Sequence, residues 1–330
     1  MRHYNIPIFV PHKGCPHDCA FCNQKKITGK TVVPTGEDVK RAIETALDSF
    51  KEEDRFSEVA FFGGSFTAIE ANLQEELLSA AYPYIKSGDI DGIRCSTRPD
   101  AISDEILKRL VHFGVTTVEL GVQSTDEEVL ARSLRGHTAA DVRKAAKLIH
   151  EYGIDLGVQV MTGLPGDTVE KDIETVKELI ALSPVCARIY PVLVLVDTEL
   201  YKMYREGQYV AQTIDEAVDI CAILYEMFIK ANVHVIRMGL MASNEIREMS
   251  QSVVAGPCHS SFGELVKSRV LLGKLRRDAI KKEDKMVVYV HPKELSMAIG
   301  NCKRNKETLE KEWGGAVLFV ADAHRKLYLP

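Results

Sequence analysis

The chain has 330 residues, 45% of them hydrophobic and 27% charged, which is the composition of a folded globular protein rather than a disordered one. A formal net charge of −5 excludes a uniformly basic surface, so a nucleic-acid partner has only local basic patches to bind. No apolar run approaches the roughly 18 residues that a membrane-spanning helix needs. The first apolar run is short and interrupted by prolines, so it is no signal peptide, and we expect a cytoplasmic protein without a membrane partner.

The first predicted element is a strand over 6–10, and a cysteine-rich loop follows it. Cys15, Cys19 and Cys22 fall within eight residues and are spaced C-x3-C-x2-C. Closely spaced thiolates can wrap an iron–sulfur cluster. Three ligands for a four-iron cube leave one iron open to a ligand from outside the protein, and an open position is typical of a catalytic metal site.

The same cysteines allow other interpretations. They can form a zinc site with His17 or His12 as the fourth ligand, a redox pair of Cys19 and Cys22, or a chance group of structural cysteines. The other five cysteines are scattered singly, at Cys95, Cys186, Cys221, Cys258 and Cys302.

Beyond the cysteine loop, short apolar strands alternate with amphipathic helices. Such alternation predicts a parallel sheet with right-handed crossovers, and we expect an α/β fold, an open or partial (β/α)6 barrel. In chain order we expect a helix from 36, a strand over 57–62, a helix over 71–84, a strand over 92–97, a helix over 103–113, a strand over 116–122, helices over 126–133 and 139–152, a strand over 156–161, a helix over 169–182, a strand over 186–190, helices over 198–205 and 214–231, and a strand over 234–239.

The pattern changes in the last quarter of the chain. We divide the chain into a barrel over 1–240 and a small α+β accessory domain over 241–330. The tail predicts a strand over 286–290, a helix over 292–313, and strands over 316–321 and 326–329.

Polar and glycine-rich segments follow the strand ends, where α/β folds bind their ligands. Gly63 and Gly64 let a ligand approach the backbone closely, although a plain tight turn explains them equally well. Glu119 and Gln123 lie on one side of their strand. A carboxylate inside a barrel needs a partner, and Arg135 is a candidate, although it can equally form a salt bridge at the rim.

The C-x3-C-x2-C motif, with the aromatic Phe21 before its last cysteine, resembles the radical S-adenosylmethionine (SAM) superfamily. In that family the open iron of a [4Fe–4S] cluster chelates SAM, and reductive cleavage gives methionine and a 5′-deoxyadenosyl radical. The resemblance implies that Cys15, Cys19 and Cys22 bind the metal, and that the cofactors are a [4Fe–4S] cluster and SAM. It also implies an electron donor such as ferredoxin or flavodoxin.

The resemblance also implies which residues contact SAM. The family usually has an acidic residue where Ser65 stands, so we expect the backbone carbonyls of the glycine turn to carry most of that contact. Arg98 is either a contact to the SAM carboxylate or ribose, or a surface arginine beside a capped turn. The expected contacts are Gly63, Gly64, Ser65, Thr97, Arg98, Glu119, Gln123, Gln159, Met161 and Arg188.

Candidate catalytic residues lie outside the cysteine loop. Cys258 and His259 follow a Gly-Pro turn, where a thiol can donate a hydrogen atom to a substrate radical and an imidazole can move protons near neutral pH. Tyr190 adds a phenol at a strand end. We expect these three to be catalytic; the alternative is that Cys258 and His259 are structural.

Segments 119–124, 135–138, 163–166, 190–193 and 198–201 together are similar to the radical SAM half of the Elongator catalytic subunit. That subunit modifies the wobble uridine of tRNA with acetyl-CoA. The chain has no glycine-rich CoA loop, so we expect no acetyltransferase domain.

The resemblance implies a radical SAM enzyme that acts on tRNA. The alternatives are a radical SAM enzyme acting on a small molecule, a porphyrin or a peptide, and a non-enzymatic metal- or RNA-binding protein. Basic residues within 25–30, 274–282 and 303–306 are the candidate tRNA contacts, although they can equally be solvated helix faces.

Overall fold

The computed structural model describes residues 2–11, 18–22, 32–50, 55–239, 252–282 and 285–329. In this part of the chain, seven strands form a sheet in the order β1-β2-β3-β4-β5-β6-β8, and all their pairings are parallel. Each predicted strand of the barrel is confirmed. The bounds are β1 Arg2–Val10, β2 Arg55–Gly63, β3 Gly92–Thr97, β4 Val115–Gln123, β5 Asp155–Thr162, β6 Cys186–Pro191 and β8 His234–Met238.

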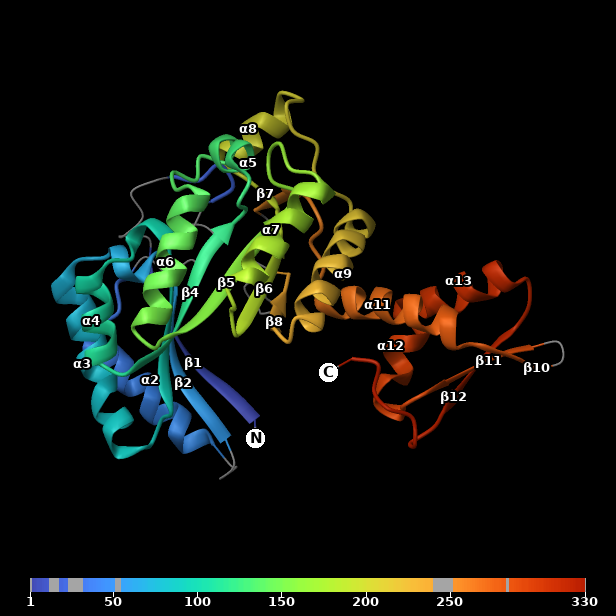
Figure 1. Ribbon diagram of the computed structural model, residues 1–330, viewed down its shortest axis with the longest axis horizontal. Helices are drawn as coiled ribbons and strands as arrows, with labels where there is room; N and C mark the ends of the chain where they lie inside the picture. The colour runs from blue at the N-terminus through green and yellow to red at the C-terminus, as the bar shows by residue number, and fades with distance from the viewer. Residues whose placement is uncertain are drawn as a thin grey trace.

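Helices between the strands cover one face of the sheet (Figure 1). Three of them begin with a capping box, at Thr35, Thr138 and Thr213, in which a threonine and the third helical residue satisfy each other's backbone amides. The helices are α2 Gly36–Ser49, α3 Ala71–Ser87, α4 Asp104–His112, α5 Glu127–Arg132, α6 Ala139–Glu151, α7 Val169–Ala181, α8 Glu199–Arg205 and α9 Ile214–Lys230. Short 3-10 turns lie at Phe66–Ala68 and Pro99–Ala101.

Alternate residues of the strands face opposite sides of the sheet. Val59 on β2, Ile93 on β3 and Val118 on β4 belong to the hydrophobic core beneath the helices. The residues that flank each of them along its own strand face the opposite side of the sheet. We call that other side the inner face. The sheet curls around this inner face. The Arg188 guanidinium on β6 lies 4.9 Å from the centre of the Phe62 ring on β2, although three strands separate β2 from β6, and a flat sheet would hold them much farther apart. The expected partial barrel is confirmed.

The C-terminal part is a small α+β unit that extends from the barrel along α11 (Figure 1). Its parallel pair β11–β12 carries the short strand β10 on one edge. A second small sheet pairs β7 with β9 beside the barrel. The remaining elements are β7 Val194–Leu195, β9 Val253–Ala255, α11 Phe262–Asp278, β10 Ile280–Lys282, β11 Lys285–Val290, the 3-10 turn Pro292–Glu294, α12 Leu295–Ile299, the 3-10 turn Asn301–Lys303, α13 Arg304–Trp313 and β12 Val317–Ala321.

Two expectations for the tail are wrong. Residues 326–329 form no strand, because the amides of Tyr328 and Leu329 donate to the carboxylate of Glu294 instead of to a neighbouring strand. The helix expected over 292–313 is broken, because Gly300, Cys302 and Lys303 have positive φ angles of 85°, 50° and 62°. A right-handed helix does not continue through such residues.

Helix α11 was not expected from the sequence. Val266, Val270 and Leu271 belong to the barrel core, whereas Leu272 and Leu275 belong to the core of the C-terminal part. The expected domain boundary between 240 and 241 falls in the segment 240–251, outside the described residues. Among the helices that are described, none combines the length and the apolar character needed to cross a bilayer.

Candidate functional site

The described end of the cysteine loop lies beside the carboxyl end of the sheet. Cys15 is outside the described residues, whereas Cys19 is buried and Cys22 half-buried. The Cys22 amide donates to the Cys19 carbonyl at 2.9 Å, which closes a tight turn. Between the two cysteines, Ala20 donates to the Ser133 carbonyl at 2.9 Å and accepts from the Leu200 amide at 2.7 Å. The turn is therefore anchored to the residue after α5 and to the start of α8.

The buried Arg135 side chain joins this turn to the sheet. Its Nη1 donates to Cys19 Sγ at 3.2 Å, and its Nη2 donates to the carbonyl of Gly121 on β4. Arg98 Nη2 in turn donates to the Arg135 carbonyl at 2.7 Å. The expected pair between Arg135 and Glu119 is wrong, because Glu119 binds other arginines.

Four charged residues form a buried ladder across the inner face. Arg94 lies 2.7 Å from Glu58 and 3.0 Å from Glu119. Arg188 holds Glu119 from the other side through two hydrogen bonds, of 2.5 and 3.0 Å. At the start of the ladder His3 lies 2.7 Å from Glu58. Each carboxylate thus has an arginine partner, as buried charges require.

The ladder keeps both carboxylates ionised. Burial raises the pKa of Glu119, but the hydrogen bond and charge of Arg188 and the charge of Arg94 outweigh burial and leave the pKa below its ordinary value. At Glu58, burial also raises the pKa, and the bond from His3 and the charge of Arg94 reverse that effect. These groups are therefore fixed charges rather than proton donors near neutral pH.

Two glutamines lie near the ladder. Gln159 is half-buried, and its amide lies 3.1 Å from both Glu119 and Ser96. Gln123 ends β4 with a left-handed φ of 71°, and its buried Oε1 has no hydrogen-bond partner among the described residues. Such a backbone conformation is uncommon for a residue other than glycine, and an unpaired buried acceptor is unusual. Met161 packs instead with Val192 and neighbouring apolar residues.

The glycine turn after β2 lies against the end of β1. Gly63 has a φ of +116°, and a Cβ there would lie 2.4 Å from the Val10 carbonyl, so only glycine fits. The Gly64 amide donates to that same carbonyl at 3.0 Å. Because β1 leads into the cysteine loop, the glycine turn lies against the residue from which that loop starts, Val10 at the end of β1.

The other predicted residues of this region form one buried network. Ser65 Oγ lies 2.7 Å and Thr67 Oγ1 2.5 Å from Thr97 Oγ1. Arg98 binds Asp100 through two hydrogen bonds, of 2.8 and 2.9 Å. The alternative of a surface arginine is wrong, because Arg98 is only 2% exposed. The hydroxyl groups of Ser65 and Thr97 are thus bonded to each other.

The structure does not join the three expected catalytic residues through any hydrogen bond among the described residues. Tyr190 is half-buried, with its hydroxyl 3.4 Å from Arg188 Nη1. Cys258 is exposed, and its amide donates to the Gly256 carbonyl at 2.9 Å. His259 Nδ1 accepts from the Ser261 amide at 3.0 Å, just before α11.

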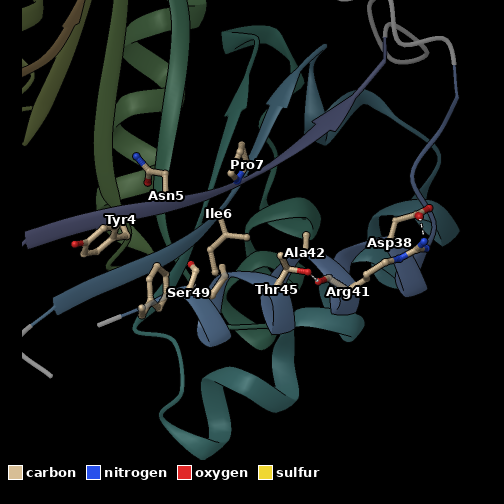
Figure 2. A pocket seen from close by; sticks show the side chains of 11 residues that line it. Tyr4, Asn5, Ile6, Pro7, Asp38, Arg41, Ala42, Thr45 and Ser49 are labelled. Atoms are coloured by element: carbon tan, nitrogen blue, oxygen red, sulfur yellow. Dashed lines mark hydrogen bonds and ion pairs between the residues drawn. The ribbon is translucent and has the colours of Figure 1, made fainter. Parts of the chain in front are cut away.

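An open groove of about 660 Å³ lies elsewhere, between β1 and α2 (Figure 2). It is lined by β1 residues such as Tyr4 and Ile6 and by α2 residues such as Ala42 and Thr45, with the Asp38–Arg41 ion pair at one end. None of the predicted site residues lines it, so we do not assign it to the candidate site.

Besides Glu58 and Arg94 of the ladder, two further buried ionisable groups, His137 and Asp172, were not predicted from the sequence. Burial, with the charges of Arg135 and Arg98, lowers the pKa of His137 to about 3, and both of its ring nitrogens lack a partner among the described residues. Burial and the neighbouring Asp167 raise the pKa of Asp172 on α7 to about 9. A signal was present for Asp172: it lies four and seven residues before the buried Val176 and Leu179, which places it on the buried face of α7.

Among the described residues, which exclude Cys15, no three His, Cys, Asp or Glu side chains are grouped as a metal site would need. Comparison with known families adds evidence of a different kind. The profile of the Radical SAM superfamily matches residues 9–179, more than half of the chain, and the profile of the Radical_SAM C-terminal domain matches residues 184–271.

Individual relatives agree with these profiles. The tRNA uridine(34) acetyltransferase of Methanocaldococcus infernus is 28% identical over 230 residues, covering 63% of this chain and 42% of that protein. Human Elongator complex protein 3 is 33% identical over 134 residues, covering 40% of this chain and 24% of that protein. The chain therefore spans less than half the length of these relatives.

The fold also matches a solved structure, that of the archaeal Methanocaldococcus infernus Elp3 with an N-terminal deletion. The TM-score is 0.65 at 24% identity, covering 83% of this chain and 64% of that one. The inner face, the glycine turn beside the cysteine turn and the two profile matches all agree, and the chain belongs to the radical SAM superfamily.

Proposed function

We propose that this chain is a radical SAM enzyme that modifies tRNA. Membership of the superfamily implies a [4Fe–4S] cluster and SAM. The matched relatives are named tRNA uridine(34) acetyltransferases, and this name supports tRNA as the substrate class. The observation in the structure that carries the proposal is the Arg135 guanidinium against Cys19, at the carboxyl end of a curled parallel sheet.

The residues present fit the cluster. Arg135 is buried, and its described partners are the Gly121 carbonyl and Cys19 Sγ, with no carboxylate among them. A buried guanidinium needs negative charge nearby, and a cysteine supplies it when it binds metal as a thiolate. The arrangement suits a ligating Cys19. Cys15, Cys19 and Cys22 would hold the cluster.

The residues around the turn also fit SAM. Glycine has no side chain to keep a ligand away from the backbone, and Gln123 Oε1 on β4 is a buried acceptor with no partner among the described residues. Gly63, Gly64, Gln123 and Gln159 are the contacts that the geometry favours most. Ser65, Thr97 and Arg98 would support the turn from behind, because their polar groups bind one another and Asp100.

When bound, the cluster and SAM supply a 5′-deoxyadenosyl radical after one-electron reduction by a donor such as ferredoxin or flavodoxin. The chain's own residues would do the rest. Arg135 holds the Cys19 side chain, and the ladder around Glu119 fixes the inner face. Tyr190 and the exposed Cys258, with His259, remain candidates for the proton and hydrogen-atom steps at the substrate.

A second candidate function is a radical SAM reaction on a small molecule. It is favoured by how the expected tRNA-binding cations are engaged. Arg276 pairs with Glu312, Arg304 with Asp215 and Lys306 with Glu310. Lys274 donates to the Tyr328 carbonyl. Such pairing leaves less positive charge for phosphate, and the patch at 25–30 lies outside the described residues.

A comparison of strains with and without the gene separates the two candidates. Bulk tRNA is digested to nucleosides and analysed by mass spectrometry together with a metabolite extract. The proposal predicts a modified uridine that is present only with the gene. Unchanged tRNA nucleosides with an altered metabolite would reject tRNA and favour the small-molecule reaction.

A further inference from the structure

The inner face carries one more cation than the ladder neutralises. Arg237 on β8 is the register partner of Arg188 on β6, so the two side chains emerge on the same side of the sheet. Among its buried and half-buried residues that the structure describes, the inner face has two carboxylates, Glu58 and Glu119, against three guanidiniums. The carboxylates pair with Arg94 and Arg188, and Arg237 is left over.

Arg237 is half-buried, and the described part of the chain offers it neither a hydrogen bond nor an ion pair. Its surroundings are unfavourable to charge: burial lowers its pKa and Arg188 adds to that effect, with only Tyr190 opposing. A half-buried guanidinium without a counter-charge is costly. Its planar fork suits a carboxylate or a phosphate group, which it binds through two parallel hydrogen bonds.

A second donor lies beside it. The Tyr190 hydroxyl is 3.4 Å from Arg188 Nη1 and accepts from that nitrogen, which leaves its own proton free to donate. Tyr190 lies two residues after Arg188 on β6, so it is on the same side of the sheet as Arg237, and it raises the pKa of Arg237. Both lie on the last two strands of the described sheet, β6 and β8, and β8 is an edge strand. Both side chains are half-buried, so part of each remains accessible to a ligand.

We propose that Arg237 and Tyr190 form a binding subsite for an oxyanion of the substrate, a phosphate or carboxylate group. The inference rests on the proposed function, because the subsite shares the inner face with the proposed SAM site. In an RNA substrate the oxyanion is a phosphodiester next to the modified nucleotide; in a small molecule it is a phosphate or carboxylate of the substrate itself.

The first test uses inorganic phosphate and measures thermal unfolding of the anaerobic, cluster-loaded protein in about 50 mM phosphate or in chloride of equal ionic strength. Phosphate should stabilise the wild type, and R237Q should lose this effect. Y190F should keep only part of it. R143Q is the matched control: it removes one positive charge from the outer helix α6, where Arg143 pairs with Glu178, and should respond like the wild type.

The second test titrates an anticodon stem-loop RNA at several salt concentrations. If the oxyanion is a phosphodiester, R237Q should bind about tenfold more weakly, with a log–log salt slope shallower by about 0.7. R143Q should match the wild type. A different outcome is that the phosphate effect depends on Arg237, but RNA binding is absent or is unchanged in R237Q. This outcome assigns the oxyanion to a small molecule and rejects only the tRNA function.

Equal phosphate stabilisation of wild type and R237Q, or none in the wild type, overturns the subsite. RNA binding then judges the tRNA proposal separately. If R237Q does not fold, R237K replaces it. Lysine keeps the charge but loses the planar fork, so phosphate should bind R237K several-fold more weakly, and an unchanged effect also overturns the subsite.

Discussion

At the scale of single residues, the charge of the inner face depends on the buried ladder. Glu119 is 1% exposed and is held by Arg94, Arg188 and Gln159. Such a pair need not stabilise a protein relative to apolar residues, but removing one partner leaves a buried charge without compensation. The ladder therefore behaves as a unit.

We expect Glu119→Ala to lower the free energy of unfolding by about 3–5 kcal/mol, because Arg188 loses its carboxylate and Arg94 keeps only Glu58. Urea unfolding measures this. Asp219→Ala is the control: it breaks the pair between the exposed Asp219 and the half-buried Arg269 and should cost less than about 1 kcal/mol. Similar losses in the two variants would contradict a buried ladder.

Asp172 makes stability depend on pH in a predictable direction. Its pKa is raised from 3.8 to about 9 in the folded chain, so the folded state keeps a proton that the unfolded state releases. The stability that this proton supplies is complete below about pH 4 and is lost as the pH rises toward 9. Asp167 shares the site and accepts from the Gly163 amide at 3.1 Å.

Asp172→Asn cannot release a proton, so its melting temperature should fall less than that of the wild type between pH 5 and pH 9. Thermal unfolding across this range tests the point, with the exposed Asp219→Asn as control. Parallel curves for wild type and Asp172→Asn would show that Asp172 titrates normally in the folded chain.

At the scale of elements, strands that are apolar runs and helices with one apolar stripe were predictable, whereas a helix that packs on two cores was not. The strands β1 to β6 read as apolar runs, and their helices have one apolar stripe. Helix α11 turns Val266 and Leu271 to one core and Leu272 and Leu275 to another. Its apolar residues therefore form no single stripe, and Gly263 and Gly273 weaken the helical signal further.

Some features of the candidate site were also predictable from the sequence, and others were not. The cysteine spacing and the glycine turn are local signals that the sequence shows directly. The partners of Glu119 and Arg135 depend on which strands lie side by side and on how far the sheet curls. No local sequence pattern singles out Arg237, because its proposed role depends on its register with Arg188 on the neighbouring strand.

Gly273 in the middle of α11 offers a test of that helix. A Cβ there meets no atom within 4 Å, and its φ lies outside the left-handed range. Gly273→Ala should therefore raise the free energy of unfolding by about 0.5–1 kcal/mol, because alanine restricts the unfolded chain and favours the helix. Gly63→Ala, which would place a Cβ 2.4 Å from the Val10 carbonyl, should destabilise. Destabilisation by Gly273→Ala in urea would speak against α11 as described.

For the whole molecule, we propose that a barrel and a C-terminal accessory domain meet along α11, with the latter gripping the tRNA stem. In the accessory domain Arg277 and Lys281 are exposed and have no partner in the described part of the chain, unlike Arg276, which binds Glu312. A net charge of −5 makes such local patches decisive.

Reversing the charges of Arg277 and Lys281 to Glu should weaken binding of bulk tRNA at low salt. It should also make the salt dependence shallower, by roughly one log unit per log unit of salt for each phosphate that the variant no longer neutralises. Arg143→Glu on the outer helix is the control. Filter binding at two salt concentrations measures both effects. Unchanged tRNA affinity in the double variant would remove the accessory domain from the binding surface.

The most direct measurement combines metal content with SAM cleavage in anaerobically purified protein. A radical SAM enzyme should hold about four iron and four sulfide per chain and should form 5′-deoxyadenosine from SAM after reduction by dithionite. Cys15→Ala, Cys19→Ala and Cys22→Ala should each lose both, whereas the exposed Cys302→Ala should keep both. A colourless, zinc-loaded wild type that leaves SAM intact would contradict the assignment of a [4Fe–4S] cluster and SAM to this chain.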